Sequence, residues 1–337
     1  MSFQKVVANK PGVQDRPNPN WEKHALVDSP VAIRSPQYQP STSATEALRV
    51  LDLNKNFRSG FLRKSIRGIQ GVSFTVAKGE VFALLGHNGA GKTTTINCIL
   101  DLVHPDGGEI KIFDHPSTHL SSRSKIGYLP ERPYFFEHLT GRELLAFYSR
   151  LLDVPTDEQT AQISNILEKT GMTASADIRL RKYSKGMLQR IGLAQAMLGD
   201  PDLLILDEPM SGLDPIGRRE VRHLLQDLKA QGKTIILSSH IVPDVEVLAD
   251  SVGIMCEGRL ATVCSMSALA NQSSYEIRVL DDQSNLGSFI LKADSIEGLR
   301  STLDQCSREN KTVQAVETKC SGLEDLFLQV HAERKQV

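Results

Sequence analysis

The stretch GHNGAGKTT, residues 86–94, holds the residue types that bind phosphate. Its first eight residues fit the pattern G-x-x-x-x-G-K-[ST], between a strand pattern and a helical pattern. Glycines allow the backbone to wrap closely, so that N–H groups point at the phosphates. We expect Lys92 to reach the terminal phosphates and Thr93 to place its hydroxyl on Mg²⁺. The candidate nucleotide-binding residues are Gly86, His87, Asn88, Gly89, Ala90, Gly91, Lys92, Thr93 and Thr94.

Three polar residues end two apolar strand patterns farther along the chain. In LLILDEP (203–209), Asp207 would hold Mg²⁺ through its water shell, and Glu208 would be the general base for the attacking water. In KTIILSSH (233–240), His240 stands at the carboxyl end of a strand, where ligands bind in α/β sheets. A neutral imidazole there could donate a hydrogen bond to the γ-phosphate. Taken alone, Glu208 could be an ordinary loop acid and His240 a structural histidine.

A second anion site is predicted in YSKGMLQR, residues 183–190. Ser184 is a good N-cap, and an apolar-periodic run follows it. The start of a helix offers unpaired N–H groups and partial positive charge, and Lys185 would add a full charge. The chain therefore carries two phosphate sites, far apart in sequence.

The surrounding patterns place these motifs in an α/β domain. Strand patterns over 47–57 and 71–86 precede the phosphate-binding loop, and helical patterns dominate 140–182. In that helical region, Thr140 and Glu143 form a predicted capping box. Beyond YSKGMLQR, strand and helix patterns alternate, which predicts a largely parallel sheet.

The composition predicts a soluble globular protein. Hydrophobic residues make up 40% of the chain, enough for a full core, and its 39 basic and 40 acidic residues argue against a nucleic-acid surface. Five cysteines without metal-type spacing predict reduced thiols in the cytosol. The start MSFQKVVANK lacks the apolar segment of a signal peptide. Apolar runs such as 81–85 are far shorter than the roughly 20 residues that span a bilayer.

Five motifs, taken in chain order, resemble those of ATP-binding-cassette (ABC) transporter ATPase subunits. They are GHNGAGKTT, YLPE (128–131), YSKGMLQR, LLILDEP with SGLD (211–214), and SSH (238–240). The resemblance covers about residues 47–265. The stretch SGLEDLFLQV (321–330) resembles the close of subunits in the drug-resistance-type export branch. The resemblance implies an α/β P-loop cassette with a β-rich antiparallel subdomain, a helical subdomain and a small C-terminal α+β extension. It also implies that the chain binds ATP and Mg²⁺.

The sequence also sets the expected domain limits. Residues 1–45 hold six of the 15 prolines and no lasting periodic pattern, which predicts a disordered N-terminal tail. The resemblance indicates an ABC ATP-binding domain over 46–268 with its helical subdomain at about 132–182, and the mixed patterns that follow indicate a C-terminal accessory region over 269–337. Within the accessory region, a strand is predicted over 275–280 and a helix over 323–333.

The resemblance implies that two cassettes meet head to tail and bury two ATP molecules. Each ATP lies on the phosphate-binding loop of one chain and under YSKGM of the other, where the common form reads LSGGQ. Ser184 and Gly186 match that form and are expected to meet the γ-phosphate, while Lys185 adds charge in place of glycine. Asp214 matches the D-loop aspartate that crosses the dimer, and His240 matches the switch histidine.

Two further positions depend on the resemblance. Glu131 stands where the family usually carries a glutamine that contacts Mg²⁺ and relays to the membrane partner, and a carboxylate can also contact Mg²⁺ or its waters. The aromatic residue that stacks on adenine should lie near the end of the first strand, where Phe57 fits best and Phe61 is the runner-up. The alternative for Phe57 is a place in the core.

We therefore expect an ATP-hydrolysing subunit that lies peripherally at the cytoplasmic face of a membrane. It would drive transport, with export favoured, through a separate integral membrane permease docked near Glu131. Glu208 would activate water, while Lys92 and His240 stabilise the charge that develops on the phosphoryl group. The second cassette would be an identical chain or a paralogue, and no nucleic-acid partner is expected.

The alternative is a soluble ABC ATPase without a transport role. The translation-associated kind normally joins two cassettes in one chain, and the DNA-repair kind separates its motifs by long coiled coils. This chain has one phosphate-binding loop, one YSKGM and no heptads, so both kinds fit poorly. A P-loop switch protein would leave YSKGM and SSH unexplained.

Overall fold

The computed structural model describes residues 45–59, 64–270, 273–280, 288–293, 295–309, 311–320 and 322–334. The tail predicted over 1–45 lies outside these ranges except for Thr45. The predicted limits of the ATP-binding domain and of the accessory region stay predictions.

A six-stranded sheet carries most of the predicted site. Its strands are β3 (Val81–Leu85), β6 (Ile126–Leu129), β7 (Leu203–Leu206), β8 (Thr234–Ser239), β9 (Ser251–Cys256) and β10 (Arg259–Ser265). They follow the order β10-β9-β3-β8-β7-β6, and only the β10–β9 pair is antiparallel. The prediction of a largely parallel sheet is therefore confirmed. Strands β3, β7, β8 and β9 are buried along their whole length, as expected for strands covered on both faces.

Three helices follow strands β3, β7 and β8. They are α1 (Lys92–Ile99) after β3, α6 (Pro215–Ala230) between β7 and β8, and α7 (Val242–Leu248) between β8 and β9. Because neighbouring parallel strands end at the same edge, the residues that follow β3, β7 and β8 meet there. This edge receives the phosphate-binding loop, the two acids and His240.

A four-stranded antiparallel sheet packs beside the first. Its strands are β1 (Glu46–Ser59), β2 (Lys64–Ala77), β4 (Gly107–Ile112) and β5 (His115–Pro116), in the order β2-β1-β4-β5. One buried core joins the two sheets, with Phe74 of β2 stacked on Phe82 of β3 at 4.8 Å between ring centroids. Ile96 of α1 belongs to the same core, which fixes the phosphate-binding loop between the sheets. A short helix, α2 (Leu120–Arg123), follows this sheet.

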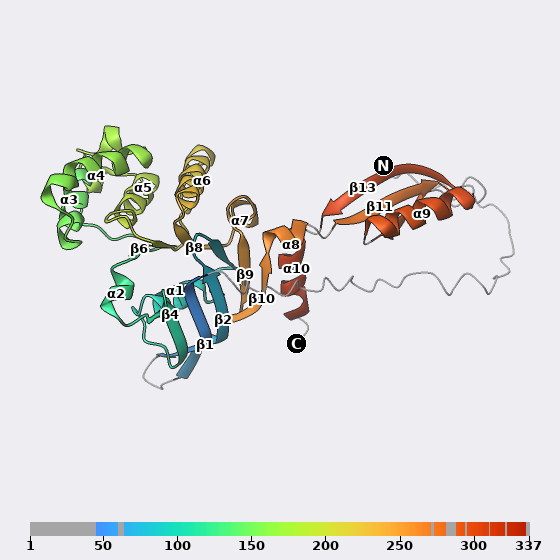
Figure 1. The fold of residues 1–337 in the computed structure, drawn as a ribbon, viewed down its shortest axis with the longest axis horizontal. Coiled ribbons are helices and arrows are strands. Elements are labelled where there is room, and N and C mark those ends of the chain that lie inside the picture. The colour runs from blue at the N-terminus through green and yellow to red at the C-terminus, as the bar shows by residue number, and fades with distance from the viewer. Residues whose placement is uncertain are drawn as a thin grey trace, which may run out of the picture. The chain divides into compact units, whose positions relative to one another are not determined.

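Helices fill most of the segment between β6 and β7. They are α3 (Gly141–Leu151), α4 (Thr156–Lys169), η1 (Thr173–Ser175), η2 (Leu180–Lys182) and α5 (Lys185–Ala196). The predicted capping box is present, because Thr140 accepts from the Glu143 N–H and Glu143 accepts from the Thr140 N–H. Helices α3, α4 and α5 contact one another and are grouped in Figure 1.

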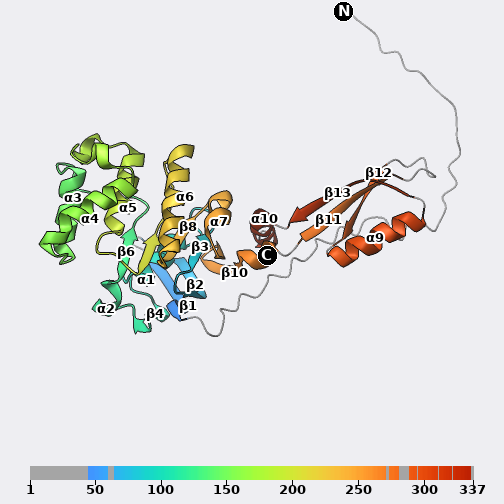
Figure 2. The ribbon, with the colours of Figure 1, turned by 45° about the horizontal axis from the view of Figure 1, so that its top comes forward.

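The described residues beyond β10 form helix α8 (Met266–Ala270), a small sheet and helix α10 (Leu323–Arg334). The sheet contains β11 (Ser273–Leu280), β12 (Ser288–Ala293) and β13 (Thr312–Cys320), in the antiparallel order β12-β11-β13. Helix α9 (Ile296–Arg308) lies along this sheet (Figure 2) and shares a core with Ile277 and Val279. The predicted strand over 275–280 and helix over 323–333 are confirmed. None of the described helices is long and apolar enough to cross a bilayer.

Candidate active site

The phosphate-binding loop joins β3 to α1 and is held from within by Lys92. The Lys92 ammonium donates to the Gly86 carbonyl at 2.7 Å and is 3.2 Å from Glu208 Oε1. Gly91 has φ 104°, and a Cβ there would lie 2.8 Å from the Ile69 side chain. Both the backbone conformation and the packing therefore require glycine at this position.

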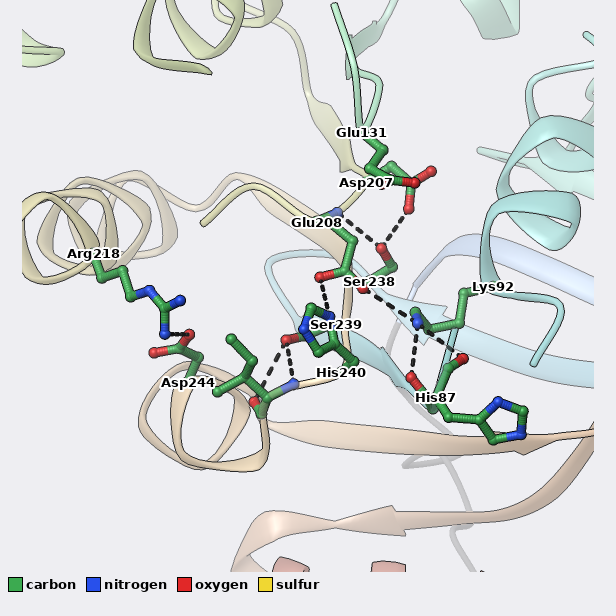
Figure 3. Close-up of polar contacts among 12 residues, drawn as sticks. His87, Lys92, Glu131, Asp207, Glu208, Arg218, Ser238, Ser239, His240 and Asp244 are labelled. Carbon is green, nitrogen blue, oxygen red and sulfur yellow. Dashed lines mark hydrogen bonds and ion pairs between the residues drawn. The ribbon is translucent and has the colours of Figure 1, made fainter. Parts of the chain in front are cut away.

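The two acids after β7 are fixed by a serine of the next strand. Ser238 of β8 donates to an Asp207 carboxylate oxygen and accepts from the Glu208 N–H at 2.9 Å (Figure 3). Burial raises the pKa of Asp207, while the nearby hydroxyls of Ser238 and Thr93 lower it. Thr93 and Asp207 therefore lie close together, as their predicted shared role at Mg²⁺ requires.

Glu208 stands between a lysine and a histidine. Its Oε2 is 2.9 Å from His240 Nδ1, and its other oxygen faces Lys92 (Figure 3). The Glu208 backbone has φ 50°, a conformation that costs energy for a residue with a side chain and that occurs often at functional sites. Glu208 is 8% exposed, so its carboxylate meets these two partners with little competition from water.

A cavity of about 430 Å³ opens over the loop, and its lining includes most of the predicted nucleotide site. The lining residues are Phe57, Gly68, Asn88, Gly89, Ala90, Gly91, Lys92, Thr93, Thr94, Glu131 and Glu208. The Phe57 ring lies over Gly68 of β2, where a Cβ would be 2.8 Å from the ring, and the residue is 39% exposed. The structure thus places Phe57 at the cavity and not in the core. The runner-up, Phe61, lies outside the described residues.

The YSKGM motif begins α5, as predicted. The Ser184 hydroxyl accepts from the Met187 N–H at 3.2 Å and so caps the helix. Tyr183, which departs from the common form, donates to the Ser175 carbonyl at 2.6 Å and is buried. This tyrosine anchors the start of the motif to the helical segment, a structural role that the sequence did not reveal.

The Lys185 side chain packs against the SGLD loop of the same chain. A Cβ added to Gly212 would meet the Lys185 stem at 2.5 Å, so the stem lies against that glycine. The same SGLD loop places Leu213 beside Gly186, where a Cβ would have 3.3 Å to the leucine side chain. Asp214 caps α6 by accepting from the Gly217 N–H at 2.8 Å.

The site residues fall into two groups within one chain. The loop, the acids and His240 meet at one sheet edge. Ser184 and Gly186 lie at the N-terminus of α5, and Asp214 lies at the N-terminus of α6. Among the described residues, those three do not line the cavity over the loop.

The residues present fit a hydrated Mg²⁺ ion. Asp207 Oδ2 is buried and has no hydrogen-bond partner among the described residues, so a lone pair remains for a ligand. Thr93 and Glu131 line the adjoining cavity with oxygen atoms, the donors that Mg²⁺ prefers.

Two positioning residues were missed from the sequence. Ser238 bridges both acids, and Gln189 of α5 donates to the Glu208 carbonyl at 3.2 Å. The serine could have been noticed in SSH, next to His240. The buried glutamine gave no signal, because only the fold brings α5 against the end of β7.

Comparison with known proteins agrees with these observations. A family model described as ABC transporter matches residues 69–211. An uncharacterized ABC transporter ATP-binding protein of Nostoc sp. is 41% identical, over 72% of this chain and 74% of that protein. A fluoroquinolones export ATP-binding protein of Mycobacterium tuberculosis is 32% identical, over 85% of this chain and 93% of that protein. A solved structure of the ATP-binding subunit of an ABC transporter has a TM-score of 0.60 and 31% identity, over 66% of this chain and 91% of that chain.

Proposed function

The chain belongs to the family of ABC transporter ATP-binding proteins, and from this premise we propose how its own residues hydrolyse ATP and which way the transporter moves its cargo. As a member of the family, it is an ATPase subunit that uses ATP and Mg²⁺ to drive transport through a separate permease. The observation that carries the mechanism is the carboxylate of Glu208, held between Lys92 and His240 at the cavity over the loop.

Glu208 is the proposed base for the attacking water. Its backbone is fixed by Ser238 and Gln189, so its carboxylate can turn only about its own side chain. Lys92 and His240 would exchange the carboxylate for phosphate oxygens when ATP binds, which frees Glu208 to accept a proton from water. In the transition state the same two residues stabilise charge on the phosphoryl group. Thr93, Asp207 and Glu131 would hold Mg²⁺, which would supply further charge neutralisation.

The second cassette is proposed to be another copy of this chain. The chain contains both halves of the shared site, with the loop, Glu208 and His240 on one side and Ser184 and Gly186 on the other. Two copies placed head to tail would therefore form two equivalent sites. The N-terminus of α5, capped by Ser184, would direct backbone N–H groups at the γ-phosphate of the partner.

The permease is proposed to dock next to Glu131, on the cytoplasmic face of a membrane. Tyr134 and Phe136 follow Glu131 closely and are 89% and 52% exposed, and exposed aromatic residues are common at protein interfaces. Export is the proposed direction, on the strength of the likeness to the fluoroquinolones export protein.

Co-purification tests the transport function. The tagged chain, isolated from detergent-solubilised membranes of its own cells, is expected to elute with an integral membrane protein of several spans, and the complex is expected to hydrolyse ATP. If the whole chain remains in the soluble fraction with full ATPase activity, the soluble ABC ATPase becomes the better account.

The stacking role of Phe57 predicts a loss of ATP affinity. Removing a stacked aromatic costs about 1–3 kcal/mol per base, so Phe57→Ala should raise the Kd for ATP roughly tenfold, measured by isothermal titration calorimetry. Phe57→Trp keeps a π-face and should bind nearly as the parent does. Phe136→Ala removes another exposed ring and serves as the control. Equal Kd values for Phe57→Ala and the parent would exclude stacking.

A further inference from the structure

Two histidines and a cysteine from three distant segments meet beside the phosphate-binding loop. His87 belongs to the loop, Cys256 ends β9, and His331 lies on α10. One ligand atom from each residue lies within 4.8 Å of the other two. The mechanism proposed above uses none of these three side chains. The sequence showed no metal spacing because these ligands stand far apart along the chain.

Backbone carbonyls select the tautomer of both histidine rings. His331 Nδ1 is 3.0 Å from the Phe327 carbonyl, and His87 Nδ1 is 2.7 Å from the Asn88 carbonyl. A carbonyl can only accept, so in the neutral form of both rings Nδ1 carries the proton and Nε2 keeps its lone pair. Metal-binding histidines are commonly oriented in this way by a backbone carbonyl.

His331 Nε2 is left without a partner in this arrangement. It is buried and makes no hydrogen bond to any described residue. The His331 ring is held between the ring of Phe327 at 4.4 Å and that of His87 at 5.4 Å, measured between centroids. The packing therefore orients the nitrogen, and a buried lone pair without a donor favours a bound ligand.

The framework around the three ligands is fixed before any ion binds. The Gly258 N–H donates to the Ala90 carbonyl at 3.0 Å, which ties the end of β9 to the loop. Helix α10 is anchored where the Leu323 N–H donates to a Glu246 carboxylate oxygen of α7 at 3.1 Å. The backbone therefore holds the three ligand atoms near one another, and a tetrahedral ion would draw them to the spacing of its own ligands.

We propose that His87, Cys256 and His331 form a binding site for a transition-metal ion of the Zn²⁺ class. Imidazole nitrogen and thiolate sulfur are ligands for Zn²⁺, whereas Mg²⁺ prefers oxygen, so this site and the Mg²⁺ site select different ions. Binding releases the thiol proton, and a water molecule supplies the fourth ligand. The bound ion clamps α10 to the phosphate-binding loop. The proposal does not depend on ATP hydrolysis.

Metal stoichiometry tests this site. The full chain, free of nucleotide and Mg²⁺, is equilibrated with ZnCl₂, passed through a desalting column, and analysed for zinc per chain. One zinc ion per parent chain is expected. Cys256→Ser and His331→Phe should lose it, and because loss of even an outer-shell partner costs about 10–100-fold in metal affinity, their Kd for Zn²⁺ should rise at least tenfold. His331→Phe keeps a ring in the contact with Phe327, so its fold is expected to survive, as checked by circular dichroism.

Two matched variants and a spectroscopic probe complete the test. His223→Ala removes an exposed histidine of α6, and Cys264→Ser changes another buried thiol, so both should still bind one zinc ion. With CoCl₂ in place of ZnCl₂, the parent should show a thiolate-to-cobalt absorption band that Cys256→Ser lacks. The proposal is overturned if the parent keeps no zinc, if His331→Phe binds zinc as tightly as the parent, or if the cobalt band is absent.

Discussion

Glu208→Gln is expected to lower kcat for ATP hydrolysis at least about 100-fold while ATP still binds, because general-base catalysis contributes roughly 10²–10⁴-fold. Glutamine has nearly the same shape and can keep a contact with Lys92 or His240, but it cannot take a proton from water. The Ser238 bond to the backbone N–H at this position is retained, so the loop should keep its conformation. Phosphate release measures the rate, and retention of labelled ATP on the protein measures binding.

Glu257→Gln is a matched control for this variant. Glu257 also follows a strand of the six-stranded sheet and also has φ 50°, yet it is exposed and is not one of the residues that line the cavity. The Glu257→Gln variant should hydrolyse ATP at the parental rate. If Glu208→Gln also hydrolyses ATP at that rate, Glu208 is not the base.

Ser184→Arg should abolish hydrolysis in an otherwise ATP-binding chain. The substitution places a bulky side chain at the start of α5 and removes the hydroxyl that accepts from the Met187 N–H. Ser184 does not line the cavity of its own chain, so the Kd for ATP of the monomer should change less than about threefold, within 0.7 kcal/mol. Loss of binding equal to loss of hydrolysis would count against a role in the partner's site.

The variant also loses a helix cap, which costs about 0.5–2 kcal/mol of stability by itself. Ser184→Thr separates the two effects, because threonine can cap the helix and keeps a hydroxyl. It should retain most of the hydrolysis rate. Thermal unfolding of both variants checks that Ser184→Arg is still folded at the assay temperature.

The sequence predicted best where chemistry requires residue types at fixed spacing. The phosphate-binding loop could be predicted because its requirements are local. The backbone at position 91 has φ 104°, which favours glycine, and position 92 carries the cation of the loop, a lysine. Alternating strand and helix patterns predicted the largely parallel sheet, and its parallel strands brought Glu208 and His240 to one edge. These features depend on local geometry and on one general rule of sheet topology.

What the sequence could not predict depends on tertiary packing. The position of the Lys185 stem is one example, because it lies against Gly212, a contact that exists only because the SGLD loop folds back on α5. The Gln189 bond to Glu208 and the meeting of His87 with His331 join segments with no shared pattern. For Phe57, the choice between core and cavity depends on how the ring packs over Gly68 of the neighbouring strand.

The most direct test of the shared site is the mass of Glu208→Gln in solution with Mg²⁺ and ATP, measured by light scattering after size-exclusion chromatography. A mass near 74 kDa, twice the 37.2 kDa of one chain, is predicted with ATP, and a mass near 37.2 kDa without it. The Glu208→Gln, Ser184→Arg double variant should bind ATP and remain near 37.2 kDa. A Glu208→Gln chain that binds ATP and stays monomeric, or a double variant that doubles in mass equally well, would contradict a site completed by Ser184 of a second copy.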